Sequence, residues 1–404
     1  AMTFVPVVMT SYQNKEEEFD DETVLLQLRT DHADRTAKLR SEAAELEQAT
    51  MKQAIITAPN PDIDSCDVHS DEFKADRSVC NLHFERIQVM DVEMPSPWSA
   101  SQALVKIVAS DANPLDWKHF NAAQGGEGMG CDLAGYIVTL GQECAQSSGF
   151  SVGDAVWGTT YHGAFAEYVV MECFMLGRTP VNFNMVQAGA SPTATLTSLE
   201  ALRWAGAPWQ NSPRVLIIGG SSGTGHVGIQ LAKAFGASQV ITTCSPENFA
   251  FVKGLGADLA LDYHTQNWWE VLPYGSVDVI YDCVCLPGSG DHAYDLLPDG
   301  GKYVTILKDS VPSDDKVALR PSVSSHDFLL DQSSTEYLDM IKDLVEDGKL
   351  TVKIDRSFYG LDSVGDLLNA SFQGHAVGKL SLVVDPRALR LAQTQMLGGQ
   401  SLRH

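Results

Sequence analysis

Short, largely apolar runs separated by polar and turn-forming residues dominate the chain from residue 51 to about residue 175. Residues 52–57 and 103–109 contain branched apolar side chains and each predict a strand. Gly-Glu-Gly and Gly-Asp sequences, which favour turns, separate the later runs from one another. The pattern therefore predicts a β-rich domain of about 120 residues.

A different periodicity begins after residue 185, where apolar positions at helical spacing alternate with short, fully apolar runs. This alternation of helix and strand calls for a parallel, doubly wound sheet with helices on its faces. Residues 351–385 return to short strands and one helix, which we place back on the β-rich domain. The predicted helices are residues 194–204, 226–235 and 248–255, and the predicted strands are residues 214–218, 239–243, 259–261, 277–281 and 300–306.

Residues 1–50 differ from the rest of the chain in their charge. They hold 11 Asp and Glu residues against 5 Lys and Arg, and neither Gly nor Pro interrupts residues 22–48, so a helix is expected there. We interpret the segment as an acidic helical or partly disordered extension and a candidate docking element for a protein partner. The expected organisation is this extension (1–50), the first part of the β-rich domain (51–185), the α/β domain (186–325), the return to the β-rich domain (326–386) and a tail (387–404).

Composition and charge exclude several classes of partner. The 404-residue chain carries a formal net charge of −24, whereas nucleic acids and anionic membranes bind basic surfaces. No apolar run approaches the roughly 18–20 residues of a membrane-spanning helix. The eight cysteines form no C-x-x-C pair and no zinc-finger spacing. We therefore expect reduced thiols in a reducing compartment, which we take to be the cytoplasm, with an organelle left open.

The sequence Gly-Gly-Ser-Ser-Gly-Thr-Gly follows the predicted strand 214–218. A phosphate cradle begins at the carboxyl end of such a strand, where the chain turns and the next helix presents free N–H groups. A literal G-x-G-x-x-G spans residues 223–228, but it starts beyond that turn, and close packing explains Gly228 inside the helix. The alternative to a cradle is a generic glycine-rich turn. We expect the dinucleotide cradle at Gly220, Ser221, Ser222, Gly223, Thr224 and Gly225.

The end of the next strand distinguishes the two nicotinamide cofactors. An NAD site places Asp or Glu there, on the ribose 2′-hydroxyl. This chain has Thr-Thr-Cys-Ser-Pro at residues 242–246, which leaves room for a 2′-phosphate and favours NADPH. Glu247 would repel that phosphate unless its side chain points outward. The further residues that we expect to bind the cofactor are Cys244, Ser245, Asn248 and Val284.

Several segments in order resemble the medium-chain dehydrogenase/reductase superfamily. They are residues 51–57, 113–119, 130–135, 163–170 and 252–258. Within it, residues 218–225 and 241–249 are most similar to the fungal trans-acting enoyl reductases of polyketide synthesis, and residues 374–379 to the quinone oxidoreductase branch. The resemblance covers residues 51–385 and implies an α/β protein with a β-rich GroES-like catalytic domain plus a Rossmann doubly wound parallel-sheet domain. It also implies zinc-independent chemistry with NADPH.

The zinc-dependent alcohol dehydrogenases of this superfamily have a cysteine ligand where this chain has Asn113. They have a His-Glu pair where it has Cys131 and Asp132. A catalytic zinc ion needs three protein ligands and an open position. That ligand set is missing from the sequence, so we expect no metal and interpret Cys131 as a small buried residue.

The resemblance also implies which residues lie at the reacting end. In the similar reductases, the Asn and Lys that match Asn113 and Lys118 line the nicotinamide end of the cleft. Asn113 would position the nicotinamide or the acceptor, and Lys118 would bind the acceptor carbonyl or donate a proton; alternatively, Asn113 shapes a turn and Lys118 is solvated. Thr197 matches a threonine near the cofactor, or else caps a helix or fills the core. Tyr263 matches a residue that covers the 2′-phosphate and adenine, or else is a half-buried tyrosine at a strand end.

The expected function is that of an NADPH-dependent reductase that needs no zinc. Hydride would pass to an electron-poor carbon of an enone, an enoyl thioester or a quinone, so the acceptor is a small molecule or is thioester-linked. One alternative is a quinone reductase without a carrier-protein partner. Another is an accessory subunit that binds NADPH without catalysis and docks through residues 1–50. The identity of the acceptor, and whether the chain is a monomer or a homodimer, stay open.

Overall fold

The computed structural model describes residues 33–41, 50–62, 66, 77–95, 99–330 and 333–387. Of the predicted N-terminal helix (22–48), residues 33–41 are described and are helical. The rest of the extension and the tail beyond residue 387 lie outside the described residues. In the part of the chain that is described, no helix is long and apolar enough to cross a bilayer.

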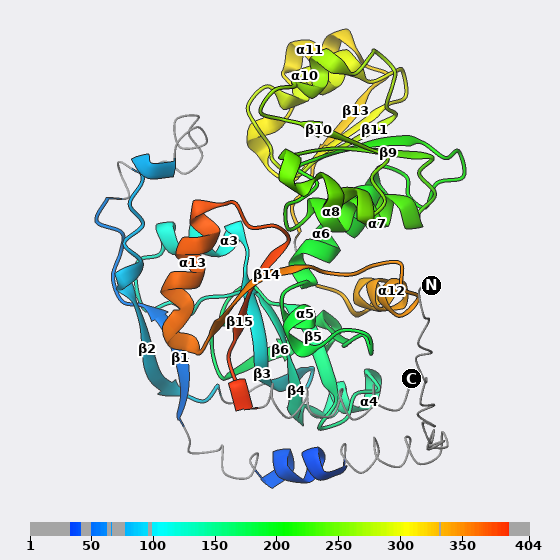
Figure 1. Ribbon diagram of the computed structural model, residues 1–404. Coiled ribbons are helices and arrows are strands. Elements are labelled where there is room, and N and C mark those ends of the chain that lie inside the picture. The colour runs from blue at the N-terminus through cyan, green and yellow to red at the C-terminus, as the bar shows by residue number, and fades with distance from the viewer. Residues whose placement is uncertain are drawn as a thin grey trace, which may run out of the picture.

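Two β-sheets lie at opposite ends of the molecule, with helix α6 (Pro192–Trp204) between them (Figure 1). The first is a mostly antiparallel seven-stranded sheet in the order β14-β15-β3-β4-β5-β7, with β6 paired to β3. Strands β1 and β2 form a separate antiparallel pair beside it. The bounds are β1 Thr50–Ile56, β2 Ile87–Glu93, β3 Gln102–Ala112, β4 Asp132–Leu140, β5 Ala155–Thr159, β6 Tyr168–Glu172, β7 Leu176–Arg178, β14 Ile354–Tyr359 and β15 Lys379–Val383.

The second sheet has six parallel strands in the order β10-β9-β8-β11-β12-β13. This order reverses beside β8, which creates the crevice where doubly wound sheets bind their ligands. The predicted α/β fold, with a GroES-like domain and a Rossmann-like parallel sheet, is therefore confirmed. The strands are β8 Arg214–Ile218, β9 Gln239–Cys244, β10 Leu259–Asp262, β11 Val279–Asp282, β12 Lys302–Thr305 and β13 Ser324–Asp327.

Helices cover both sheets, and several were not expected from the sequence. The part of the chain predicted to be β-rich also contains two helices, α3 (Pro114–Ala122) and α4 (Gln142–Ser147). Helix α3 begins with Pro at its first position after the capping residue Asn113, a combination that favours the start of a helix. The other α-helices are α5 Met185–Gly189, α7 Gly225–Ala234, α8 Phe249–Gly254, α9 Trp268–Val271, α10 Ser289–Leu296, α11 Asp314–Leu319, α12 Thr335–Glu346 and α13 Val364–Gln373, with α3 at Pro114–Ala122 and α4 at Gln142–Ser147. Short 3-10 helices are η3 Arg77–Val79, η4 Phe84–Arg86, η5 Cys173–Met175, η6 Pro246–Asn248, η7 Lys308–Ser310 and η8 Leu361–Ser363.

One apolar cluster joins the two sheets through α6. It includes Leu104 of β3, Leu199 of α6 and Val215 of β8, all of them buried. Burying a side chain of this size contributes about 1.5–3 kcal/mol. The shared core therefore fixes the two sheets relative to each other, and with them the two walls of the cleft between them.

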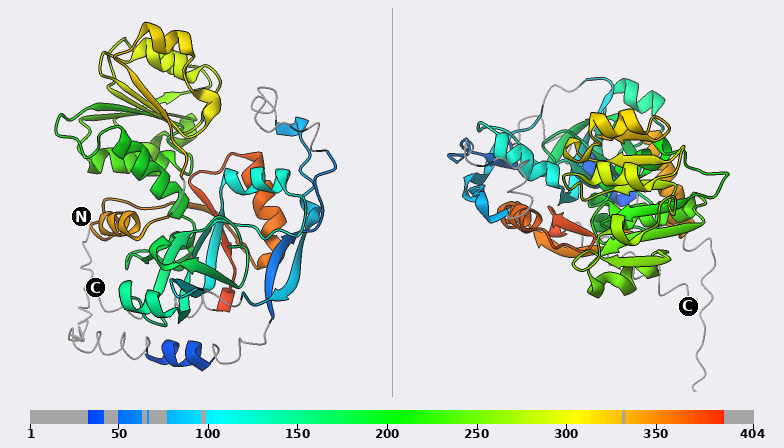
Figure 2. Two further views of the ribbon diagram at one scale, coloured as in Figure 1. Left: turned by 180° about the vertical axis from the view of Figure 1, so that it is seen from behind. Right: turned by 90° about the horizontal axis from the view of Figure 1, so that it is seen from above.

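Residues 33–41 form a helix that lies against the seven-stranded sheet, away from the parallel sheet (Figures 1 and 2). Leu39 is buried in the shared core, and the Arg35 guanidinium lies 4.5 Å from the centre of the Tyr136 ring on β4. Thr36 Oγ1 donates a hydrogen bond of 3.2 Å to the Val152 carbonyl. This part of the acidic extension is thus packed onto the fold.

The expectation of reduced thiols is wrong for four of the eight cysteines. Cys66 and Cys80 form one disulfide, and Cys144 and Cys173 form another. The second pair is separated by 29 residues, and the fold brings α4 next to η5. Local spacing could not show this, because the pairing depends on the packing of the sheet. Cys131, Cys244, Cys283 and Cys285 are free thiols.

Candidate active-site cleft

A cleft of about 760 Å³ lies between the parallel sheet and the seven-stranded sheet. Its wall on the parallel-sheet side comes from the turn after β8 and the turn after β11. Its opposite wall comes from α3, the start of β4 and the stretch before β15. Of the residues expected at the site, the cleft is lined by Asn113, Lys118, Thr197, Ser222, Gly223, Thr224 and Val284.

The turn after β8 needs glycine at several positions. Gly219 has φ of 83°, and its N–H donates to Thr243 Oγ1 at 3.0 Å. A Cβ on Gly220 would collide with Thr242 Oγ1, and one on Gly225 would collide with the Gly219 carbonyl. The backbone is therefore folded tightly enough to bring Gly223 and Thr224, just before α7, to the cleft, where an anion cradle requires backbone N–H groups. We call residues 220–225 the glycine cradle.

Ser222 occupies the position where the dinucleotide fingerprint usually has its second glycine. Its Oγ accepts a hydrogen bond of 3.0 Å from the Gly225 N–H, which satisfies one free donor at the start of α7. Further along that helix, a Cβ on Gly228 would lie 3.1 Å from two ring carbons of Tyr281. The prediction that Gly228 serves helix packing is confirmed.

The residues expected around the 2′-phosphate lie together at the ends of β9 and β10. Ser245 Oγ donates to Tyr263 Oη at 3.2 Å, and Asn248 ends the short helix η6. Tyr263 is 53% exposed, whereas the Cys244 side chain is buried and belongs to the core. Glu247 is exposed. The structure brings Ser245, Asn248 and Tyr263 to one edge of the sheet, and it places the thiol of Cys244 behind that edge.

Thr197 and Val284 flank the cradle from two different elements. Thr197 lies inside α6, whose N-cap is Ser191, so the alternative that Thr197 caps a helix is wrong. Val284 follows β11 and is 43% exposed in the cleft. A Cβ on Gly219 would lie 2.5 Å from Val284 Cγ2, so this valine packs directly on the turn that opens the cradle.

Asn113 is the N-cap residue of α3 and is buried. Its backbone N–H donates to Asp116 Oδ2 at 2.7 Å, which is the turn-shaping role given as the alternative above. Its side-chain amide donates to Asp111 Oδ1 at 3.0 Å and to Asp132 Oδ2 at 3.1 Å. Lys118, one turn further along α3, is half-buried in the cleft wall, with its Nζ 5.7 Å from the centre of the Trp117 ring.

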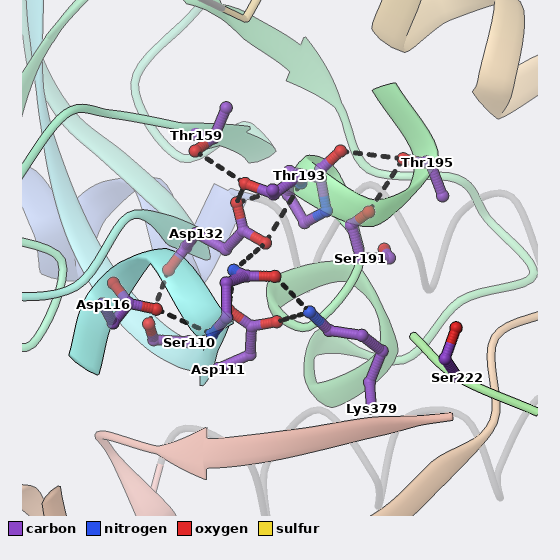
Figure 3. Close-up of polar contacts among 12 residues, drawn as sticks. Ser110, Asp111, Asp116, Asp132, Thr159, Ser191, Thr193, Thr195, Ser222 and Lys379 are labelled. Atoms are coloured by element: carbon purple, nitrogen blue, oxygen red, sulfur yellow. Dashed lines mark hydrogen bonds and ion pairs between the residues drawn. The ribbon is translucent and has the colours of Figure 1, made fainter. Parts of the chain in front are cut away.

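Lys379 belongs to the stretch 374–379 that resembles the quinone oxidoreductases, but no role at the site was predicted for it from the sequence. Its Nζ lies 2.5 Å from Asp111 Oδ2 and donates to Asn113 Oδ1 at 2.5 Å. Figure 3 shows the Lys379 side chain extending from β15 toward Asp111 and away from Ser222. We call Asp111, Asn113, Asp116, Asp132 and Lys379 the carboxylate–lysine network.

Asp132 connects this network to α6. Its carboxylate accepts hydrogen bonds from the Thr193 N–H at 3.0 Å and from Thr193 Oγ1 at 2.6 Å (Figure 3). The Asp132 carbonyl also accepts from Ser110 Oγ at 2.5 Å. Strands β3, β4 and β15 and helices α3 and α6 thus meet at one polar centre, which is buried beneath the cleft.

Burial governs the protonation of this centre. It raises the pKa of Asp116 to about 7, and it raises the pKa of Asp111 well above its usual range although Lys379 opposes the shift. For Lys379, burial alone would lower the pKa, but the charges of Asp111 and Asp132 outweigh it and the pKa is raised. All three shifts mean that the network holds its protons more tightly than the same groups do in water.

The residues at this centre do not fit a zinc ion. Within the described ranges, no group of three or more His, Cys, Asp or Glu side chains could hold a metal. Burial raises the pKa of the Cys131 thiol, which opposes the thiolate that zinc requires. The Lys379 ammonium already supplies the positive charge that the carboxylates of this centre need, and it would repel a dication placed there.

Comparison with known proteins places these features in a family. Residues 99–180 match the family profile described as "Alcohol dehydrogenase GroES-like domain", and residues 255–382 match the one described as "Zinc-binding dehydrogenase". The chain is similar to the 2-methylene-furan-3-one reductase of Solanum lycopersicum, with 33% identity over 296 residues, or 69% of this chain and 71% of that protein.

Two further relatives and one solved structure agree with this placement. A trans-enoyl reductase of Xenoacremonium sinensis is 32% identical over 57% of this chain and 67% of its own length. The chloroplastic NADPH-dependent alkenal/one oxidoreductase of Arabidopsis thaliana is 30% identical over 69% of this chain and 71% of its own length. The quinone oxidoreductase from Coxiella burnetii superposes with a TM-score of 0.67 at 27% identity, covering 83% of this chain and 100% of that one.

Proposed function

This chain belongs to the medium-chain dehydrogenase/reductase superfamily, in its zinc-independent quinone and enoyl reductase branch, and on that premise we propose that it is an NADPH-dependent reductase. It transfers hydride to an electron-poor carbon of an enone, an enoyl thioester or a quinone. The observation that carries the proposal is the single cleft that has the glycine cradle on one wall and Lys118 on the other. When bound, the nicotinamide supplies the hydride.

The glycine cradle binds the pyrophosphate through the backbone N–H groups of Gly223 and Thr224, which line the cleft just before α7. This arrangement lets a chain of net charge −24 hold an anion, because the backbone dipoles act locally. Ser245, Asn248 and Tyr263 receive the adenosine end. In the stretch 244–249 the one carboxylate, Glu247, is exposed, and the proposal requires its side chain to point away from the 2′-phosphate.

One cation lies beside the helix that follows the proposed adenosine site. Lys353 Nζ lies 5.7 Å from the centre of the Phe251 ring on α8, the helix that follows β9 and η6. A lysine at this position favours the extra charge of NADPH over NADH. We therefore assign to Lys353 the recognition of the 2′-phosphate.

At the opposite end of the cleft, Lys118 acts on the acceptor. Hydride transfer to an unsaturated carbonyl leaves negative charge on its oxygen, and a cation held in a partly buried wall stabilises that charge. The ammonium of Lys118 binds the oxygen, and it or a water molecule returns the proton that completes the reduction. The carboxylate–lysine network fixes α3, and therefore Lys118, from behind.

An acceptor panel with NADPH and NADH in parallel tests this function. We expect oxidation of NADPH with small enones, enoyl thioesters or quinones, with kcat/KM at least about 10-fold higher than with NADH. NADPH should also raise the melting temperature. Absence of both effects would contradict the proposed function.

The role of Lys118 has its own test. We expect Lys118→Ala to lower kcat/KM by about 100-fold while the affinity for NADPH changes little. Lys302, whose Nζ donates to the Trp204 carbonyl outside the cleft, provides the matched control Lys302→Ala. Unchanged turnover and KM in Lys118→Ala would remove this lysine from the mechanism and leave the reductase function in place.

A further inference from the structure

The stretch that leads into β15 touches the glycine cradle through its backbone. The Gly378 N–H donates to the Ser221 carbonyl at 2.9 Å. A Cβ on Gly223 would lie 3.1 Å from Lys379 Cδ, so the stem of this lysine packs against the cradle. Gly378 itself has φ of 86°, and a Cβ there would collide with the Lys353 carbonyl. This close approach between the two walls therefore depends on glycine on both sides.

The other end of the same lysine lies in the opposite wall. Lys379 Nζ contacts Asp111 at the end of β3 and Asn113 at the start of α3, and the side chain is 4% exposed. Asn113 uses both N–H bonds of its amide on Asp111 and Asp132, and its carbonyl oxygen on Lys379. A single side chain thus spans from the cofactor cradle to the residue that begins the helix of Lys118.

We propose that Lys379 is a positioning residue for the reduction, because it ties the glycine cradle to the carboxylate–lysine network and thereby sets the separation between cofactor and acceptor. This inference rests on the proposed function. Lys379 does not touch the reacting atoms; it acts through Asn113 and α3 on one side and through the cradle on the other. Its distinctive effect is therefore on the nicotinamide end of the cofactor site and not on the adenosine end.

Physical reasoning favours such a role for a buried ion pair at this place. Hydride transfer requires the hydride-donating and hydride-accepting carbons to approach within about 3–3.5 Å. A misplacement of about 1 Å lowers the rate on the order of 100-fold. Apolar contacts across the cleft allow sliding, whereas an ion pair with fixed hydrogen bonds has one geometry. A buried pair contributes little net stability for its cost, which makes geometric specificity its main benefit here.

The experiment replaces the pair together. Lys379→Met alone leaves Asp111 buried without its cation, which is strongly destabilising. The double variant Asp111→Asn/Lys379→Met removes both charges and keeps the volumes similar. Its matched control is Lys233→Met/Asp258→Asn, which removes another Lys–Asp pair, 2.6 Å apart, at the last turn of α7. The measurements are the melting temperature, the affinity for 2′,5′-ADP, the fluorescence of bound NADPH, and kcat.

We expect the double variant to bind 2′,5′-ADP within about threefold of the original protein, because that probe lacks the nicotinamide half. We expect kcat to fall by about 30–100-fold, and the emission of bound NADPH to shift because the nicotinamide is no longer held in one environment. The control pair should change neither. A folded double variant with unchanged kcat and unchanged emission overturns the inference and leaves the proposed function intact.

Two further outcomes separate the inference from the proposed function. If the original protein binds NADPH but reduces no acceptor, the proposed function fails, and the emission of bound NADPH in the double variant alone decides the role of Lys379. If the double variant does not fold, Asp111→Asn decides, because Lys379 keeps its hydrogen bond to Asn113 and still faces the negative charge of Asp132, so its ammonium is not left uncompensated. That single variant should lose about 5–10-fold in kcat with unchanged 2′,5′-ADP binding; no loss overturns the inference.

Discussion

The glycine cradle and the carboxylate–lysine network face each other across one cleft, but they are stabilised in different ways. The cradle is set by backbone: glycines at 220 and 225 are required because a Cβ would collide with neighbouring atoms. The network is set by side chains from four elements, which are joined by an ion pair and hydrogen bonds in the buried interior and are bonded to Thr193 of α6. The cradle should therefore lose stability when side-chain volume is added to it, and the network should lose stability when a polar partner is removed.

Adding a methyl group to the cradle should produce the largest effect. In Gly220→Ala the new Cβ meets Thr242 Oγ1, which cannot withdraw because it donates to the Ile217 carbonyl at 2.7 Å. We expect the free energy of unfolding to fall by about 3 kcal/mol and the affinity for NADPH to fall at least about 100-fold. Calorimetry and fluorescence titration measure the two quantities.

Gly254→Ala provides the control for that substitution. Gly254 ends α8, and a Cβ there meets no atom within 4 Å. Alanine should leave NADPH binding unchanged and make the protein slightly more stable. Equal effects of the two substitutions would show that the tight turn after β8 is not what the cradle depends on.

Removing a hydrogen-bond acceptor from the network should lower the free energy of unfolding by less than Gly220→Ala does. Asp132→Ala removes the acceptor of the Thr193 N–H and of one N–H of the Asn113 amide, and it leaves the Thr193 hydroxyl with Thr159 Oγ1 alone. Because buried donors lose their hydrogen bonds, we expect the free energy of unfolding to fall by about 2–3 kcal/mol in urea denaturation. Asp132→Asn, which keeps one acceptor oxygen, should lose less than half of that amount. Equal losses in both variants would mean that volume, not polarity, decides here.

The same difference explains how much the sequence could reveal. The cradle was predictable because strand, turn and helix are contiguous, and β8 has the predicted bounds. The network was not predictable, because Lys379 and Asn113 are 266 residues apart and meet only after β15 pairs with β3. The motif that contains Lys379 pointed to the family, but nothing local indicates that its ammonium lies beside Asp111. The Cys144–Cys173 disulfide escaped prediction for the same reason.

The pH dependence of stability should have opposite signs in the two regions. Burial raises the pKa of Asp116 in the network to about 7 from 3.8, so its contribution is complete below about pH 4 and is lost as the pH rises toward 7. Burial lowers the pKa of His226, beside the cradle, to about 4 from 6.5, so its contribution is complete above about pH 6.5 and is lost as the pH falls toward 4.

Each of these groups contributes a slope of at most about 1.4 kcal/mol per pH unit, and the two slopes partly cancel in the original protein. Asp116→Asn should therefore make stability rise more steeply with pH between about pH 4.5 and 6.5. His226→Gln, which keeps a donor for the Ser222 carbonyl, should make stability fall with pH in the same window. Urea denaturation at several pH values measures both. Parallel profiles for the two variants would contradict the opposite burial effects.

The smallest predicted effect lies at the edge of the cradle, where Lys353 connects the two regions. Its backbone N–H donates to His226 Nε2 at 3.4 Å, and its carbonyl accepts from the Lys379 N–H at 2.9 Å; Lys353→Met keeps both contacts and removes only the ammonium. We expect the dissociation constant of NADPH to rise about 5–10-fold and that of NADH to change less than about twofold, with the difference shrinking at high salt.

Lys349→Met, which removes a cation paired to Asp347 on the surface, should change neither constant. An equal rise in the dissociation constants of NADPH and NADH would mean that Lys353 interacts with the pyrophosphate, which both cofactors share. The 2′-phosphate would then be recognised by the hydroxyls of Ser245 and Tyr263 without a cation.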